Sequence, residues 1–375
     1  MHSDYRFVLE VRTLDGAVLH REALSPDWEP AVEATRLAAL RTGGVWPHTG
    51  STTPRLEPVW HAAAGEPFVQ AVRVHTECEG REWVTDIPTS RYFNGTARSV
   101  VAAQLAAGRI HAEDRVRYAV AAYAVSEQGH GAPPLRFVTT DRPQTLSVRD
   151  RRLAELRDLS LLCGEVDPAD LGVVLPEEVL DEICRLTRDA GDRETGGILL
   201  GHLCRDGRVG DIGLEVTAHV PARHTVGDAV KLTFTSDTWT DVRAAVALRR
   251  ADELLVGWWH SHPAAAWCRQ CPSERQRVCQ LSTGFLSSDD QALHRVMFPE
   301  AYTQALVVTN SIVGLETKLF GWREGVLQPR GFHLRRARIP GSLARDSVRP
   351  LASALGAACA EEPHALPDAI ALSSQ

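Results

Sequence analysis

Residues 258–263 read Trp-Trp-His-Ser-His-Pro and carry two histidines, His260 and His262, one residue apart. The apolar run before them, residues 254–259, predicts a buried strand. Residues i and i+2 of a strand point to the same face, so the two imidazoles should converge on one point. Pro263 cannot donate to a sheet ladder and should end the strand. Two neutral imidazoles on one face form half of a site for a divalent metal, especially zinc.

A third ligand could come from residues 287–290, Ser-Ser-Asp-Asp, which precede a segment with helical spacing of apolar residues. One interpretation of Ser287 and Asp290 is a capping pair at the start of that helix. The other is a metal ligand, because an acidic residue in a first helical turn is favoured by the macrodipole and can direct its carboxylate outward. The two histidines upstream favour Asp290 as a ligand.

Glu194 begins the stretch Glu-Thr-Gly-Gly-Ile-Leu-Leu-Gly, residues 194–201, in which a short apolar run follows a glycine pair. Glu194, then His-Ser-His-Pro at 260–263, then Ser287 and Asp290, resemble in this order the JAMM metalloproteases. These are the catalytic MPN-domain deubiquitinases and their bacterial relatives. The resemblance covers about residues 171–326 and implies an α/β fold, an MPN domain with a mixed central sheet flanked by helices.

The resemblance implies a role for each of these residues. His260, His262 and Asp290 would be the ligands of one catalytic zinc. Glu194 would be the general base for the attacking water, and Ser287 would donate a hydrogen bond to the oxyanion. The implied reaction is hydrolysis of a peptide or isopeptide bond without a covalent intermediate.

The implied substrate is a ubiquitin-like protein, cleaved from its conjugates or matured from its precursor. The activating and conjugating enzymes of the same system are further candidate partners. Two other functions stay open. One is a peptidase that releases an adduct from a small sulfur-carrier protein, and the other is a non-catalytic MPN scaffold, which the presence of all five motif residues disfavours.

An insertion at residues 264–284 departs from the family, which usually has only a handful of residues between the His-Pro pair and the serine. It contains Cys268, Cys271 and Cys279. These cysteines could hold a second, structural zinc, could staple the loop by redox chemistry, or could be free thiols. Because the insertion leaves the metal-binding strand and returns just before Ser287, we expect it to border the cleft and contact the substrate.

A second zinc would need a fourth ligand besides the three cysteines of the insertion. The candidates for that ligand are His202, Cys204 and His294. His294 also follows Asp290 by one helical turn, where it could support the catalytic ligands. We interpret His294 instead as a surface histidine.

The composition favours a protein of the cytoplasm that uses neither nucleic acid nor a membrane. A net charge of −7 gives no basic surface for nucleic acid and no polybasic membrane signal. No run of 18 apolar residues occurs, and the first residues lack a signal-peptide core. The chain has eight cysteines, and the five outside the insertion are dispersed, unlike those of a secreted disulfide framework.

With 375 residues, the chain is expected to form two domains. Residues 1–150 predict an α+β domain without a catalytic constellation, whose expected role is to bind a partner or substrate. Residues 151–170 are interpreted as a connector with a helix at 153–162, and residues 171–327 as the metalloprotease domain. Residues 328–375 are expected to be a poorly ordered tail.

Hydrophobic periodicity and turn residues give the element boundaries. In the N-terminal domain, the expected strands are 5–12, 18–23, 68–76, 81–87 and 115–125, with hairpin turns at Asp15-Gly16 and Glu79-Gly80, and the expected helices are 30–41 and 97–107. In the second domain a helix should follow Pro176 and another should cover 238–250, with strands at 198–200, 213–220, 231–234, 304–309 and 314–322.

Overall fold

The computed structural model describes residues 5–43, 54–61, 68–78, 81–124, 146–222, 234–249, 251–269, 271, 272, 279, 284–336 and 372–374. The chain divides into two compact units. The first contains Met1–Thr145, Glu324–Val326 and Glu362–Gln375, and the second contains Leu146–Arg323 and Leu327–Glu361. In the part of the chain that the structure describes, no helix has the length and apolar character to cross a membrane.

The first unit contains a four-stranded sheet in the order β17-β6-β1-β2 and a three-stranded sheet in the order β3-β4-β5. The strands are β1 (Tyr5–Thr13), β2 (Val18–Ala23), β3 (Arg55–His61), β4 (Phe68–Cys78), β5 (Arg81–Pro88), β6 (Val116–Ala124) and β17 (Leu372–Ser374). The helices are α1 (Glu29–Arg41), α2 (Thr89–Tyr92) and α3 (Asn94–Ala106).

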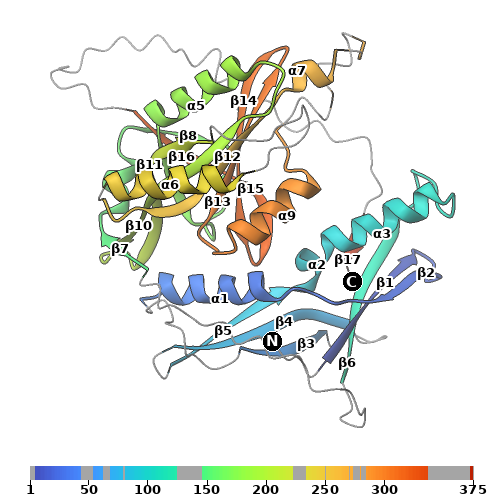
Figure 1. The fold of residues 1–375 in the computed structure, drawn as a ribbon. Helices are drawn as coiled ribbons and strands as arrows, with labels where there is room; N and C mark the ends of the chain where they lie inside the picture. The colour runs from blue at the N-terminus through green and yellow to red at the C-terminus, as the bar shows by residue number, and fades with distance from the viewer. Residues whose placement is uncertain are drawn as a thin grey trace. The chain divides into compact units, whose positions relative to one another are not determined.

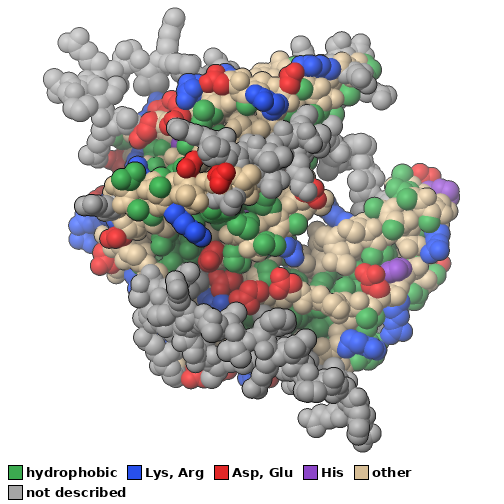
Figure 2. Space-filling model, in the orientation of Figure 1, with side chains coloured by type: hydrophobic (Ala, Val, Ile, Leu, Met, Phe, Trp, Pro, Cys, Tyr) green, Lys and Arg blue, Asp and Glu red, His purple; other side chains and the backbone are tan. Residues whose placement is uncertain are grey.

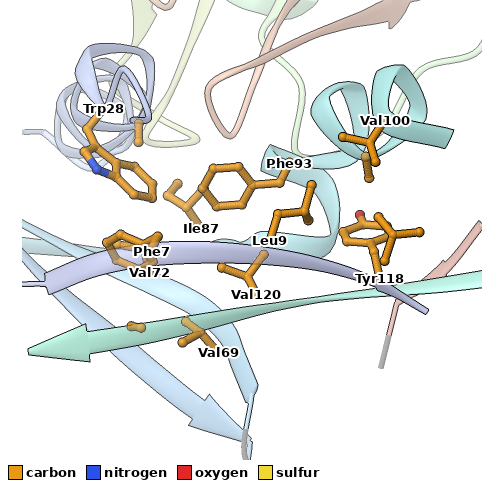
Figure 3. Close-up of a cluster of buried hydrophobic side chains, with 14 of the residues drawn as sticks. Phe7, Leu9, Trp28, Val69, Val72, Ile87, Phe93, Val100, Tyr118 and Val120 are labelled. Carbon is orange, nitrogen blue, oxygen red and sulfur yellow. The ribbon is translucent and has the colours of Figure 1, made fainter. Parts of the chain in front are cut away.

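One hydrophobic core joins the elements of the first unit. Phe7 and Leu9 alternate along β1 toward the core, which also contains Trp28, Ile87 and Phe93 (Figure 3). The Phe7 and Trp28 rings meet edge to face, with centroids 5.2 Å apart. These are apolar residues at strand and helix spacing, so the α+β elements expected from the sequence form here.

The predicted β1–β2 hairpin is confirmed. Gly16 in its turn has φ of 94°, a conformation that favours glycine. The turn expected at Glu79-Gly80 lies outside the described residues. The sequence did not predict β3, whose alternation is interrupted by Pro58; the strand lies at a sheet edge, where proline is tolerated.

The second unit is built on one large mixed sheet, in the order β15-β14-β13-β12-β10-β11-β9-β16-β8, with β7 pairing in parallel with β10 (Figure 1). The strands are β7 (Val148–Asp150), β8 (Ser160–Cys163), β9 (Gly172–Pro176), β10 (Gly196–Asp206), β11 (Asp211–Pro221), β12 (Leu254–His262), β13 (Gln304–Ser311), β14 (Gly314–Arg323), β15 (Val326–Arg330) and β16 (Phe332–Arg335). The helices are α4 (Leu153–Arg157), α5 (Glu177–Ala190), α6 (Ser236–Arg249), α7 (Ala264–Trp267) and α9 (Ser288–Met297).

Strand β12 lies inside this sheet, antiparallel to β10 and parallel to β13. Neighbours on both sides leave it no open edge, which explains its nearly continuous apolar sequence. Gly257 is required here: its φ is 145°, and a Cβ atom would lie 1.9 Å from the carbonyl oxygen of Gln304. Strand β13 therefore approaches β12 closely near its start.

The face of the sheet that carries Trp258 packs against α6 and α9. Its core contains Trp258, Phe298, Ile198 and Val307 together with other buried apolar side chains. On the face of the molecule shown in Figure 2, hydrophobic and charged side chains are intermixed at the surface. Helix α9, which carries Asp290 in its first turn, is thus packed on the sheet through an apolar core.

The expected connector is part of the second unit's sheet. The helix predicted at 153–162 ends at Arg157, and after Leu159, whose φ is 57°, the chain forms β8 and pairs with β16. The charge of this segment suggested a connector, but Leu153 and Leu156 are buried beneath it. Tertiary packing of these two leucines decided the outcome.

The expected tail begins later than residue 328. Residues 328–330 belong to β15 and residues 332–335 to β16, and β16 pairs with both β9 and β8. Phe332 and Leu334 are buried on alternate positions of β16, an apolar pattern hidden among basic residues. Residues 337–371, and residues 231–233 of the predicted 231–234 strand, lie outside the described part of the chain.

Candidate metal centre

Strand β12 brings His260 and His262 together as its spacing predicts. Their Nε2 atoms lie 2.9 Å apart, and both side chains are almost completely buried. The strand continues through His262 and stops at Pro263, which cannot extend a ladder. Two imidazole nitrogens therefore meet at one buried point.

Helix α9 supplies a carboxylate to the same point. Oδ2 of Asp290 lies 3.4 Å from Nε2 of His260 and 3.7 Å from Nε2 of His262. Among the described residues, these three form the group of histidine, cysteine and acidic side chains close enough to hold one metal ion. Atoms bound at 2.0–2.1 Å to a tetrahedral ion lie roughly 3.3–3.4 Å apart, so this donor set fits zinc.

The capping interpretation of Ser287 and Asp290 is confirmed, because the pair forms a capping box at the start of α9. The Asp290 N–H donates to Ser287 Oγ (3.1 Å), and the Ser287 N–H donates to Asp290 Oδ2 (2.8 Å). The Ser287 hydroxyl also donates to Asp290 Oδ2, at 2.7 Å. The capping geometry thereby fixes the carboxylate that faces the histidines.

Electrostatics favour the ionised form of Asp290 and the neutral form of His262, the protonation states that bind metal. Burial alone would raise the pKa of Asp290, but hydrogen bonds from His260 and His262 outweigh it and hold that pKa well below its ordinary value. Burial lowers the pKa of His262, in spite of the nearby carboxylate. An ionised carboxylate beside a neutral imidazole is the arrangement that a divalent cation requires.

Thr195, the residue after Glu194, is hydrogen-bonded to the strand that carries the two histidines. The Thr195 N–H donates to Ser261 Oγ at 3.0 Å, and the Ser261 N–H donates to the Thr195 carbonyl at 2.8 Å. Ser261 lies between the two histidines, and Gly196 pairs with His260 in the sheet register. Glu194 is half-buried, just before β10 begins. The end of the loop between α5 and β10 is therefore pinned to the metal-binding strand.

Aromatic rings surround the two histidines. Trp258 stacks on His260, with ring centroids 4.5 Å apart and an interplanar angle of 12°. Trp267 and Phe285 pack on His262 at centroid distances of 5.1 and 4.6 Å. None of these three aromatic residues was predicted to pack on the histidines. The position of Trp258 could have been predicted, since Trp258 lies two residues before His260 on the same strand and shares its face.

The cysteines of the insertion do not gather into a second metal site in the part of the chain that the structure describes. Cys268 is buried, whereas Cys271 and Cys279 are half-buried, and all three are thiols rather than disulfides. The insertion's expected contact with substrate is untested. Trp267 of the insertion and Phe285, the residue that follows the insertion, both pack on His262.

Of the candidate fourth ligands, His202 and Cys204 are buried in β10, and neither joins a metal-binding group among the described residues. The interpretation of His294 as a surface residue is wrong. Its side chain is completely buried between α9 and the sheet, and burial lowers its pKa to about 3. The helical turn after Asp290 faces the core rather than solvent, because α9 packs its inner face on Trp258.

Comparison with known proteins finds a family match for one part of the chain. Residues 176–275 match a family described as prokaryotic homologs of the JAB domain. No curated protein matches. A solved structure that matches is the solution structure of protein DSY2949 from Desulfitobacterium hafniense. It has 19% sequence identity and a TM-score of 0.31, and the match covers 44% of this chain and 94% of that one. The family match, which includes Glu194 and both histidines, supports an MPN/JAB-family domain in this chain.

Proposed function

We propose that this protein is a zinc-dependent isopeptidase or peptidase that cleaves a ubiquitin-like modifier from conjugates or processes its precursor. One observation carries the proposal: His260, His262 and Asp290 converge from two separate elements on one buried point. Three protein ligands leave a tetrahedral zinc one position for water or substrate, the arrangement of catalytic rather than structural sites. The JAB-domain match supports a peptidase or isopeptidase role in general terms.

Zinc bound by these three residues would supply a Lewis acid that polarises the scissile carbonyl and lowers the pKa of a bound water. Glu194 would take the proton of the attacking water and return it to the leaving amine. Its half-buried place before β10, pinned through Thr195 to Ser261, suits a base that stays beside the ligands without being one of them.

Ser287 would donate its hydroxyl hydrogen to the oxyanion that develops during attack. In the structure the Ser287 hydroxyl donates to Asp290 Oδ2, with Oγ and Oδ2 2.7 Å apart. To reach a substrate oxygen, the hydroxyl must rotate away from Asp290, while the Asp290 N–H can still donate to Ser287 Oγ. Rotation of one hydroxyl costs little, and the capping box keeps the serine in place.

The choice of a ubiquitin-like modifier rests on the family resemblance. A sulfur-carrier adduct as substrate remains the alternative with the same chemistry. A non-catalytic scaffold is disfavoured because the three proposed ligand side chains meet at distances that suit a metal. A scaffold has no need of such an arrangement.

Glu194→Gln tests the assignment of the base. We expect the variant to bind zinc as the wild type does, since Glu194 is not a ligand, and to lose at least about 100-fold in hydrolysis rate because the water loses its base. His260→Ala should lose both zinc and activity. Elemental analysis measures the zinc, and cleavage of a modifier fused to a carrier measures the activity.

Two outcomes would contradict this proposal. A Glu194→Gln protein that retains full hydrolysis would exclude Glu194 as the base. A wild-type protein that binds no zinc, or hydrolyses the fusion equally well after chelation, would exclude zinc catalysis altogether.

A further inference from the structure

We infer that His294 is a positioning residue, which sets the separation between the strand that carries His260 and His262 and the helix that carries Asp290. The inference rests on the proposed function, because it concerns the same metal centre. His294 lies on α9 one turn after Asp290, and its partner Trp258 lies on β12 two residues before His260. A contact between these two side chains therefore joins the two sources of ligands.

That contact is a hydrogen bond between two completely buried side chains. The indole Nε1–H of Trp258 donates to Nδ1 of His294, with the two nitrogens 2.9 Å apart. An indole nitrogen is only a donor, so Nδ1 of His294 must be the acceptor and the ring proton must be on Nε2. The bond has one polarity, and an apolar residue at position 294 could not replace it.

The opposite edge of the His294 ring is also held. Its Nε2 lies 3.3 Å from the Thr303 hydroxyl, which can accept the ring proton's hydrogen bond. The Thr303 hydroxyl lies 2.8 Å from the carbonyl oxygen of Phe298 and 2.7 Å from that of Glu300. The hydroxyl can therefore accept from His294 and donate to a carbonyl. The end of α9 and the loop before β13 thus hold the Nε2 edge of the His294 ring.

The Trp258 ring, held by His294, in turn contacts the proposed metal ligand His260. It stacks on His260 with centroids 4.5 Å apart. A histidine that binds a metal is usually oriented by a hydrogen bond from its other ring nitrogen. Here Nδ1 of His260 and Nδ1 of His262 have no such partner among the described residues. Stacking on an anchored indole takes over the orienting role for His260.

The experiment measures zinc affinity of the full chain by competition with a coloured chelator, together with the visible spectrum of the cobalt-substituted protein. His294→Phe keeps the ring size but removes the acceptor. We expect zinc affinity to fall roughly 10- to 100-fold, as for other residues that orient metal ligands, and the cobalt bands to shift. His294→Asn can place its side-chain oxygen near the position of Nδ1, and should restore most of the affinity and the cobalt spectrum.

Ile183→Ala is the matched control, since Ile183 is completely buried in α5, a helix that carries no ligand. It should destabilise the fold without changing zinc affinity or the cobalt spectrum. If His294→Phe does not fold, Trp258→Phe removes the donor from the other side and should weaken zinc binding in the same way.

Two results would overturn the inference: wild-type zinc affinity in a folded His294→Phe or Trp258→Phe protein, or an equal loss in Ile183→Ala. Neither readout uses hydrolysis. A wild type that binds zinc but cleaves no modifier therefore contradicts the proposed function and leaves the role of His294 standing. A wild type that binds no zinc contradicts both.

Discussion

Single residues in the metal centre serve structure and chemistry with the same atoms. Oδ2 of Asp290 completes the capping box of α9 by accepting from Ser287, and it also faces the two histidines. The helix start and the ligand position therefore cannot vary independently. The same holds for His294, whose hydrogen bond from Trp258 fixes its tautomer and also joins α9 to β12.

The first prediction at this scale concerns pH. Burial lowers the pKa of His294 to about 3 from its ordinary value of 6.5. As pH falls below 6.5, the unfolded chain takes up a proton at His294 before the folded chain does. The free energy of unfolding should therefore fall between pH 6.5 and 3, by about 2 kcal/mol from pH 7 to pH 5.

Chemical denaturation of the metal-free protein at several pH values measures this dependence. His294→Asn provides the comparison, because it has no titrating group at that position. The difference in free energy of unfolding between wild type and variant should decrease as pH falls. A constant difference from pH 7 to pH 5 would rule out the buried neutral histidine.

At the scale of elements, the insertion begins directly after the strand that carries His260 and His262 and ends just before Phe285. Helix α7 follows Pro263 directly and places Trp267 on His262, and the chain returns with Phe285 on the same ring. A change in the insertion's conformation that moves Trp267 would therefore alter the packing on His262, the proposed metal ligand. Cys268, which follows Trp267, is buried.

We predict that changing Cys268, Cys271 and Cys279 together to serine lowers kcat/KM on a modifier conjugate more than on a minimal peptide. The reason is that the insertion should contact substrate groups beyond the scissile bond. Zinc content should be retained, because the catalytic ligands are unchanged. Kinetics on both substrates and elemental analysis are the measurements.

The control changes Cys163 and Cys184 to serine, two thiols outside the insertion, and should leave both substrates unaffected. An equal loss on conjugate and peptide, or no loss on either, would exclude a role of the insertion in specificity. Loss of the catalytic zinc would instead show that the cysteines support the ligand residues.

At the scale of the whole molecule, the candidate chemistry belongs to one unit. The ligands, Glu194 and Ser287 all lie in the second unit, and the metal-binding group found among the described residues lies there too. The first unit has its own hydrophobic core. Its predicted role in binding a partner or substrate remains a prediction.

We predict that zinc raises the midpoint of thermal unfolding of the second unit. Ligands from β12 and α9 meet only in the folded state, so the metal should bind the folded chain and not the unfolded one. At free zinc about 100 times the dissociation constant, this contributes about 2.7 kcal/mol. Calorimetry with zinc and with a chelator measures the shift, and His260→Ala should show none. An equal shift in that variant would place the bound zinc elsewhere.

The sequence by itself determined the local geometry of the centre. Strand spacing put His260 and His262 on one face, and capping chemistry put Asp290 at the start of a helix, because both patterns depend only on residues close in the chain. Most strands and helices followed from periodicity for the same reason. The family resemblance then linked these separate segments.

Only the tertiary structure decided how those segments meet. The burial of His294, the stacking of Trp258 on His260, and the packing of Trp267 and Phe285 on His262 depend on contacts between distant segments. The same is true of β8 and β16, which pair with each other. Their polar flanking residues led to the prediction of a connector and a tail. Charge and turn residues report on neighbours along the chain, whereas burial depends on which surfaces are brought together, and single-sequence patterns do not record that.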